Sequence, residues 1–289
     1  MRPSERPQAA AGDKRPSFPV RLPANSGMPS ASKRSFGSNP SNAADVYKPL
    51  QPLQPLQPKH AVVGLQKPMP AGVGLDSQTV RSRMVEKLAK QGVQDAAVLA
   101  AMGQVERHRF VDTALANQAY EDTSLPIGLG QTISKPNVVA RMLELLREDK
   151  GAGERLGRVL EIGTGCGYQA AVLSHLASEV YSIERLRGLH EKARENLRHF
   201  RLANVHLLFG DGMDGFAKGA PYAAIIAAAG GEAIPPAWIE QLAVGGRLVA
   251  PMQTASGQQA LVVIDKTAKG IRQAVLEAVH FVPLKSGIA

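Results

Sequence analysis

A glycine-rich turn joins a predicted strand to a predicted helix near the middle of this 289-residue chain. The strand is a short apolar and β-branched run over residues 158–162, and Gly163, Gly165 and Gly167 follow it at alternate positions. A helical pattern then begins at Tyr168. Because glycine has no Cβ, the backbone at such a turn can bend tightly and approach a bound ligand closely. The sequence therefore predicts a small-molecule site at the carboxyl end of a buried strand.

Strands and helices alternate from this point to near the C-terminus. The alternation predicts an α/β fold with a mainly parallel sheet and helices on both faces. A polar connection around Lys266–Gly270 is too short for a helical crossover, so the last two strands are expected to form an antiparallel hairpin. The seven expected strands are residues 158–162, 180–183, 205–209, 222–227, 247–250, 260–264 and 278–282.

Residues 1–75 differ in composition from the remainder of the chain. They hold 13 of the 20 prolines and repeat Pro-Leu-Gln three times between Pro49 and Pro58. Such a tract favours polyproline II and cannot bury a core. We expect a disordered, Pro-rich basic tail, with a docking site for a proline-recognising partner or an acidic surface as the alternative.

Residues 76–289 are expected to form one domain, with a helical part over 76–150 and the sheet over 151–289. Asp76 or Ser77 is placed to cap a first helix, Gly92 to end it, and Asp95 to start a second. The tail carries ten of the 34 basic residues and only three of the 25 acidic ones. Most of the net charge of +9 therefore lies in the tail, and the nearly neutral domain argues against a nucleic-acid partner.

Acidic side chains follow the second and third predicted strands. Glu184 lies 21 residues beyond Gly163, where a carboxylate can accept both hydroxyls of a ribose. Asp211 can accept from an adenine amino group, and Gly212 lets the ring approach the backbone. A solvated charge and a plain Asp-Gly turn are the alternatives. The carboxyl ends of neighbouring parallel strands share one edge of the sheet. The glycine turn, Glu184 and the Asp211-Gly212 turn are therefore expected to form one ligand site.

The glycine spacing separates two classes of ligand. Dinucleotide enzymes have G-x-G-x-x-G, whereas here the third glycine comes one position earlier. The G-x-G-x-G spacing resembles the S-adenosylmethionine loop of class I methyltransferases, whose Rossmann-like sheet has seven strands and ends in an antiparallel hairpin. An NAD-dependent oxidoreductase is the alternative, and the early glycine argues against it.

A second segment resembles a more specific signature. The run Gln131-Thr132-Ile133-Ser134-Lys135-Pro136 is similar to that of the protein-L-isoaspartate O-methyltransferases, and general methyltransferases lack it. The resemblance covers roughly residues 77–289. The stretches that carry it are residues 109–111, 119–128, 130–136, 159–168, 210–212, 234–236 and 281–284.

The resemblance implies an activity and a set of site residues. The expected reaction is methyl transfer from S-adenosylmethionine to the α-carboxylate of isoaspartyl residues in damaged peptides and proteins, without a metal. Ser134 is implied as the active-site serine, which orients the substrate and forms no covalent intermediate. Capping of the following helix is its alternative role. The implied acceptor residues are Thr132, Ile133, Ser134 and Val282, and the implied donor residues are Glu161, Gly163, Thr164, Gly165, Glu184, Asp211 and Gly212.

Four residues depart from the family pattern. Asn137 stands where relatives often have an aromatic residue or histidine, and Cys166 replaces a more usual serine. Ala223 and Ala228 stand where Asp and Thr are usual, which puts any contact of those side chains in doubt and leaves room for a wider acceptor cleft. Action on another carboxylate or on nucleic acid, and a non-catalytic relative, therefore stay as alternatives.

The cellular context is expected to be simple. One cysteine allows no disulfide within the chain, and no apolar run approaches the roughly 18 residues of a membrane span. The N-terminal stretch lacks the apolar core of a secretory signal. We expect a cytoplasmic protein that binds neither membrane nor nucleic acid, with a monomer as the default state.

Overall fold

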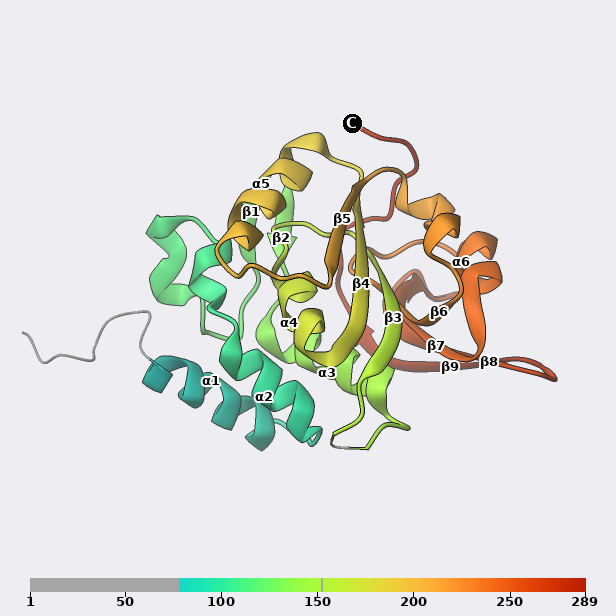
Figure 1. Ribbon diagram of the computed structural model, residues 1–289, viewed down its shortest axis with the longest axis horizontal. Coiled ribbons are helices and arrows are strands. Elements are labelled where there is room, and N and C mark those ends of the chain that lie inside the picture. The colour runs from blue at the N-terminus through green and yellow to red at the C-terminus, as the bar shows by residue number, and fades with distance from the viewer. Residues whose placement is uncertain (1–77, 152) are drawn as a thin grey trace, which may run out of the picture. The chain divides into compact units, whose positions relative to one another are not determined.

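A seven-stranded sheet forms the centre of the computed structural model, which describes residues 78–151 and 153–289 (Figure 1). The strand order is β5-β4-β3-β6-β7-β8-β9. Strands β3 to β7 pair in parallel, and β8 and β9 pair antiparallel at one edge. The strands are β3 (Leu156–Ile162), β4 (Ala177–Glu184), β5 (Val205–Phe209), β6 (Tyr222–Ala227), β7 (Leu242–Gln253), β8 (Gln259–Thr267) and β9 (Gly270–Val279).

The predicted fold class is confirmed, but one predicted strand is wrong. The last strand is not residues 278–282, because β9 occupies Gly270–Val279. This strand lies at the sheet edge, and most of its side chains are exposed on both faces, so it lacks the apolar run by which a buried strand is recognised. The apolar residues after it leave the sheet and reach the site described below. The predicted tail over residues 1–75 and the predicted cap at Asp76 or Ser77 lie outside the described residues.

Each central strand sends alternate side chains to opposite faces of the sheet, as the two-residue period of a strand requires. Val159 packs in the core of one face, with the helices α1 to α5, and Leu160 packs in that of the other. Trp238 of α6 covers the second face. Figure 1 shows α6 on the opposite side of the sheet from α1, α2 and α4. The helices are α1 (Gln78–Lys90), α2 (Ala96–Gln104), α3 (Pro136–Arg147), α4 (Tyr168–Leu176), α5 (Arg187–Arg198) and α6 (Pro236–Gln241).

The predicted signals at the first two helices act as expected. Gly92 follows α1 with φ of +105°, a conformation that favours glycine. The Asp95 side chain accepts hydrogen bonds from the backbone N–H groups of Ala97 and Val98 and so caps α2. Short 3-10 turns connect the other elements: η1 (Arg107–Phe110), η2 (Thr113–Gln118), η3 (Gly212–Asp214) and η4 (Ala217–Gly219).

The signature segment forms a small hairpin of its own. Strands β1 (Leu125–Gly128) and β2 (Gln131–Ile133) pair antiparallel and lead directly to Ser134. The helix after them, α3, is not capped by Ser134, because its N-cap residue is Lys135 and that residue makes no side-chain cap. Instead, the Asp122 carboxylate accepts from the backbone N–H of Asn137 at 2.9 Å. The capping role is thus filled from 15 residues upstream, which leaves the Ser134 hydroxyl available for another partner.

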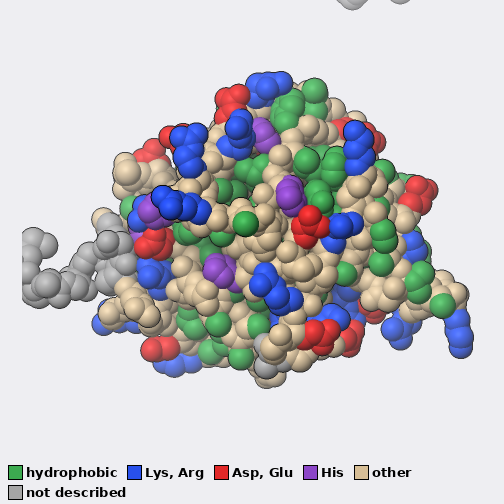
Figure 2. Space-filling view, in the orientation of Figure 1, with side chains coloured by type: hydrophobic (Ala, Val, Ile, Leu, Met, Phe, Trp, Pro, Cys, Tyr) green, Lys and Arg blue, Asp and Glu red, His purple; other side chains and the backbone are tan. Residues whose placement is uncertain are grey.

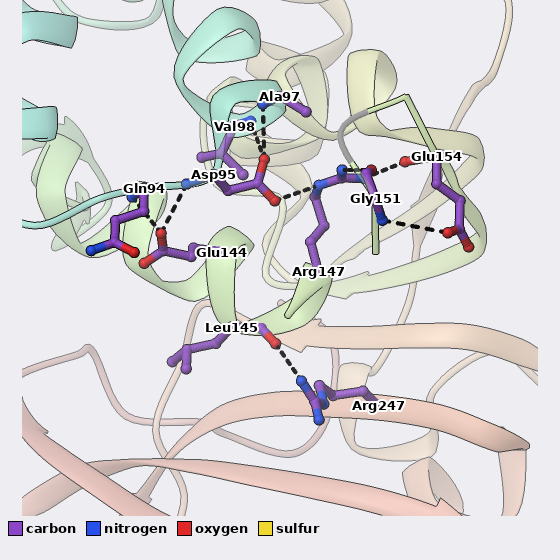
Figure 3. A network of polar contacts seen from close by, with 10 residues as sticks. All are labelled: Gln94, Asp95, Ala97, Val98, Glu144, Leu145, Arg147, Gly151, Glu154 and Arg247. Atoms are coloured by element: carbon purple, nitrogen blue, oxygen red, sulfur yellow. Dashed lines mark hydrogen bonds and ion pairs between the residues drawn. The ribbon is translucent and has the colours of Figure 1, made fainter. Parts of the chain in front are cut away.

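A polar network fixes the far end of α3 (Figure 3). Arg147, which is 1% exposed, donates to Asp95 at 3.0 Å and to the carbonyl oxygens of Glu154 and Gly151. Arg247 of β7 donates to the carbonyl oxygen of Leu145 at 3.1 Å. The C-terminal end of helix α3 is therefore tied both to α2 and to the sheet.

The strand order reverses at β3, whose neighbours β4 and β6 lie on opposite sides. In open α/β sheets, ligands bind outside the carboxyl ends of the strands at such a switch point.

Among the helices of residues 78–151 and 153–289, none has the length and apolar composition of a membrane span.

Candidate active site

A cavity of about 500 Å³ opens at the switch point, above the carboxyl ends of β3 and β4. Its size suits a nucleoside-sized ligand. The residues that line it come from the β1–β2 hairpin, the glycine turn, the end of β4 and the segment after β9. Of the predicted site residues, those in its lining are Thr132, Ile133, Ser134, Gly163, Thr164, Gly165, Glu184, Gly212 and Val282. We call this the donor cavity.

The glycine turn has a backbone that only glycine adopts readily. Gly163, Gly165 and Gly167 have φ of +87°, +56° and +92°. The turn is fastened to the next strand, because the N–H groups of Gly163 and Thr164 both donate to the carbonyl oxygen of Ile183. The predicted reason for the glycines, a tight bend, therefore holds at all three positions.

Glu184 ends β4 and is 5% exposed. Its Oε2 accepts from the N–H of Gly165 at 2.9 Å, and its Oε1 accepts from the N–H of Leu186 at 2.9 Å. These two bonds hold the carboxylate rigidly at the wall of the donor cavity. Each carboxylate oxygen can accept a further hydrogen bond, so the group is oriented to receive two hydroxyl donors.

Asp211 is engaged differently, and its side chain does not line the donor cavity. Its carboxylate accepts from the backbone N–H of Met213 at 2.8 Å and from that of Gly287. Burial acts to raise the pKa of Asp211, but these backbone hydrogen bonds outweigh it and hold the pKa below its usual value. Gly212 does reach the cavity, and a Cβ at this position would lie 2.6 Å from Ile162. Close packing on β3 therefore requires glycine here.

Glu161 also lies outside the cavity lining, beneath the glycine turn, with 0% exposure. Ser182 donates to its carboxyl group, and the Ser182 hydroxyl also bonds the Thr164 hydroxyl at 2.6 Å. Burial raises the pKa of Glu161 from 4.5 to about 8, although the hydrogen bond from Ser182 opposes this effect. The carboxyl group is thus protonated at neutral pH and supports the glycine turn from below through Ser182 and Thr164.

This buried carboxyl group makes the stability of the domain depend on pH. The folded state retains a proton that the unfolded state releases, so the free energy of unfolding should fall as pH rises from about 4.5 to about 8. Glu161→Gln has no titrating proton at this position. The free energy of unfolding of the variant, relative to that of the wild type, should therefore increase as pH rises through that range. Urea unfolding of both proteins at pH 5, 6.5 and 8 measures the difference. Parallel curves for the two proteins would show that Glu161 does not titrate in this way.

Ser134 lies where the donor cavity meets a second one. The second cavity runs from the hairpin past the ends of β6 and β7 to the segment after β9, and we call it the acceptor cavity. Six residues line both cavities: Thr132, Ser134, Ala228, Val282, Pro283 and Leu284. A group held at Ser134 is therefore exposed to ligands in both, which is the arrangement that transfer between two substrates requires.

The other predicted acceptor residues lie close by. Thr132 is exposed, and Ile133 is buried and lines only the donor cavity. Val282 is held in place because its carbonyl oxygen accepts from the N–H of Gly230 at 2.9 Å. Gln169 and Pro283 also line the donor cavity but were not among the predicted site residues. Pro283 belongs to the Phe-Val-Pro-Leu stretch at 281–284, which carries the family resemblance. Nothing in the sequence singles out Gln169.

The four departures bear unequally on the site. Ala228 lines both cavities, so the missing side chain widens their junction. Ala223 and Asn137 line neither, and the Asn137 side chain donates to Gln91 at 3.1 Å. Cys166 is buried, and burial raises the pKa of its thiol to about 11. A thiol that stays protonated is unreactive, so packing is the role that its environment supports.

The described residues contain no group of three or more His, Cys, Asp or Glu side chains arranged to hold a metal ion. The site instead offers a rigid carboxylate, a glycine turn and a hydroxyl at the junction of two cavities. Such a site can bind a nucleoside-type donor and align it with an acceptor.

Comparisons with known proteins point to one family of enzymes. A family model described as protein-L-isoaspartate(D-aspartate) O-methyltransferase matches residues 79–289. The protein-L-isoaspartate O-methyltransferase of Methylibium petroleiphilum is 66% identical over 220 residues, which are 75% of this chain and 81% of that protein. That of Leptothrix cholodnii is 64% identical over 219 residues, 75% of this chain and 77% of that protein.

Solved structures show the same likeness at lower identity. A protein-L-isoaspartate O-methyltransferase superposes with a TM-score of 0.63 and 27% identity, over 72% of this chain and 67% of that one. A Plasmodium falciparum protein described as the same enzyme, in complex with S-adenosyl-L-homocysteine, has a TM-score of 0.62 and 25% identity. The superposition includes 98% of the Plasmodium falciparum chain and 71% of this chain.

Proposed function

Because the chain belongs to the protein-L-isoaspartate(D-aspartate) O-methyltransferase family, we propose that it transfers the methyl group of S-adenosylmethionine to the α-carboxylate of L-isoaspartyl residues. Such esters collapse to a succinimide, whose hydrolysis restores some normal aspartate. The observation that supports this proposal best is the place of Ser134 between the donor and acceptor cavities.

The residues of the donor cavity suit S-adenosylmethionine. We assign the ribose hydroxyls to the fixed carboxylate of Glu184 and the methionine part to the glycine turn at Gly163–Gly165. Glu161 and Thr164 support that turn through Ser182. The adenine ring is assigned to the side of Gly212, and its amino group to the carboxylate of Asp211.

The reaction itself makes modest demands on the protein. The acceptor carboxylate is ionised at neutral pH, and the sulfonium is a good leaving group, so no strong base is needed. The acceptor oxygen attacks the methyl carbon, the carbon–sulfur bond breaks, and its electron pair stays on sulfur as S-adenosylhomocysteine. Catalysis then comes from alignment and from exclusion of water. We assign the Ser134 hydroxyl to one carboxylate oxygen, which aims the other at the methyl group, with Thr132, Ile133 and Val282 around it.

Paired peptides test this function. One peptide contains an L-isoaspartyl residue, and its twin has normal aspartate at the same position. With labelled S-adenosylmethionine we expect base-labile methyl ester on the first peptide only. Equal labelling of both peptides, or labelling of RNA in place of either, would contradict the proposal.

The role of Asp211 has its own test, because its carboxylate is held by Met213 and Gly287. If the adenine amino group also donates to it, Asp211→Asn should weaken S-adenosylhomocysteine binding about tenfold, the value of one charge-assisted hydrogen bond. A chain shortened after Lys285, which lacks the competing N–H of Gly287, should bind as tightly as the full chain or more tightly. Calorimetric titration measures both. Wild-type affinity in Asp211→Asn would restrict this carboxylate to holding the C-terminal segment.

A nucleic-acid substrate is less well supported. On the face shown in Figure 2, Lys and Arg side chains are interspersed with Asp and Glu and form no continuous basic stripe. Proteins that bind the phosphate backbone of nucleic acids typically have such a stripe.

We also propose that the enzyme works as a monomer in the cytoplasm, where a lone buried cysteine is in keeping with reducing conditions.

A further inference from the structure

Arg107 is a fully buried cation at the start of η1, with 0% exposure. Its Nε donates to the carbonyl oxygen of Ala119 at 2.8 Å, and its Nη2 donates to the carbonyl oxygen of Ser134 at 2.7 Å. These two carbonyl groups lie at the two ends of the segment that contains the β1–β2 hairpin. One planar guanidinium therefore closes this segment and holds the backbone of the active-site serine.

The same side chain also contacts the helix that follows the glycine turn. The Cζ of Arg107 lies 4.7 Å from the ring centroid of Tyr168, which is the first residue of α4 and lines the donor cavity. A cation over an aromatic face is stabilised electrostatically. Arg107 thus connects the Ser134 backbone to the element that carries the donor site.

Burying this cation is costly. The charged group loses its hydration, and its Nη1 atom is buried without a hydrogen-bond acceptor. An arginine at this position is nevertheless suited to its contacts, because its planar fork can reach two carbonyl oxygens in fixed directions while its face stacks on a ring. A lysine can supply the charge but not this fork.

We propose that Arg107 is a positioning residue for methyl transfer, which sets the place of the Ser134 hydroxyl at the junction of the donor and acceptor cavities. It acts through Ser134, since Arg107 itself lines neither cavity. This inference rests on the proposed function and adds a residue that aligns the acceptor. Loss of the fork shifts the serine relative to the donor, and shifts near 1 Å can reduce rates about 100-fold.

The test uses Arg107→Lys, with Arg107→Gln as a second variant that buries no charge. Both should lower kcat/KM for the isoaspartyl peptide at least about tenfold, yet bind S-adenosylhomocysteine within about twofold of the wild type. The matched control is Arg147→Lys, since Arg147 is also buried and also donates to backbone carbonyl groups, but lines neither the donor nor the acceptor cavity. This control should lower the melting temperature and leave kcat/KM unchanged.

A double-mutant cycle with Ser134→Ala separates positioning from a general role in folding. If Arg107 acts through the hydroxyl, Arg107→Lys should have little further effect once that hydroxyl is gone. Additive losses in the double variant would overturn the proposal, as would wild-type kinetics in both Arg107 variants. Loss of S-adenosylhomocysteine binding in both variants would reduce Arg107 to a folding residue. Failure of the wild type itself to methylate the peptide would instead refute the proposed function.

Discussion

Replacing Glu184 by glutamine should weaken S-adenosylhomocysteine binding by about 100-fold. The carboxylate is already held by the N–H groups of Gly165 and Leu186, and its remaining lone pairs are assigned to two ribose hydroxyls. Hydrogen bonds to a charged group are worth about 1.5–3 kcal/mol each, so loss of the charge at two of them gives this magnitude. In addition, the side-chain NH₂ group of the glutamine cannot accept a hydrogen bond, so the N–H group of either Gly165 or Leu186 would lose its acceptor. Calorimetric titration with S-adenosylhomocysteine measures the change.

Glu179→Gln is the matched control for this experiment. Glu179 belongs to the same strand, but its carboxylate bonds Arg158 at 2.7 Å, outside the donor cavity. This variant should bind S-adenosylhomocysteine within about twofold of the wild type, because only surface contacts change. Equal affinity of the Glu184 variant and the wild type would mean that the ribose lies elsewhere.

Replacing Ser134 by alanine should lower kcat/KM for an isoaspartyl peptide by about 100-fold, as expected when an acceptor loses its alignment. The contacts that we assign to the donor do not include Ser134, so the affinity for S-adenosylhomocysteine should stay within about twofold of the wild type. Steady-state kinetics with labelled donor, together with calorimetry, separate the two effects. The prediction distinguishes a hydroxyl that orients the acceptor from one that binds the donor.

The control here is Ser256→Ala, which removes an exposed hydroxyl bonded to Thr254 in the turn after β7. It should leave both kinetics and donor affinity unchanged. Unchanged activity in Ser134→Ala would remove the serine from the mechanism. A methylated serine recovered from the wild-type enzyme would contradict the direct transfer described above.

The lining of the donor cavity was largely predictable from sequence because its main parts are local. Gly163, Gly165 and Glu184 follow two buried strands, and neighbouring parallel strands bring their carboxyl ends to the same edge. The order of strands and helices therefore placed these residues in one cavity without knowledge of any long-range contact. The same reasoning placed Asp211 at the edge but not the direction of its side chain, which Met213 and Gly287 determine.

What the sequence did not predict depends on contacts between distant residues. Arg107 reaches Ser134 across 27 residues, and Asp122 caps α3 across 15. Glu161 was expected beside the ligand, yet its side chain turns beneath the glycine loop toward Ser182. The direction of a side chain at a strand end depends on which neighbour accepts or donates, and a single sequence does not state that.

The central claim is that one donor and one acceptor cavity meet at Ser134. A crystal structure of the enzyme with S-adenosylhomocysteine and an isoaspartyl peptide tests this claim most directly. We expect the Ser134 Oγ within about 3.2 Å of one oxygen of the peptide α-carboxylate, with the other oxygen directed toward the donor sulfur. A peptide carboxylate bound away from Ser134, or a donor bound outside the cavity at Gly163 and Glu184, would contradict the account.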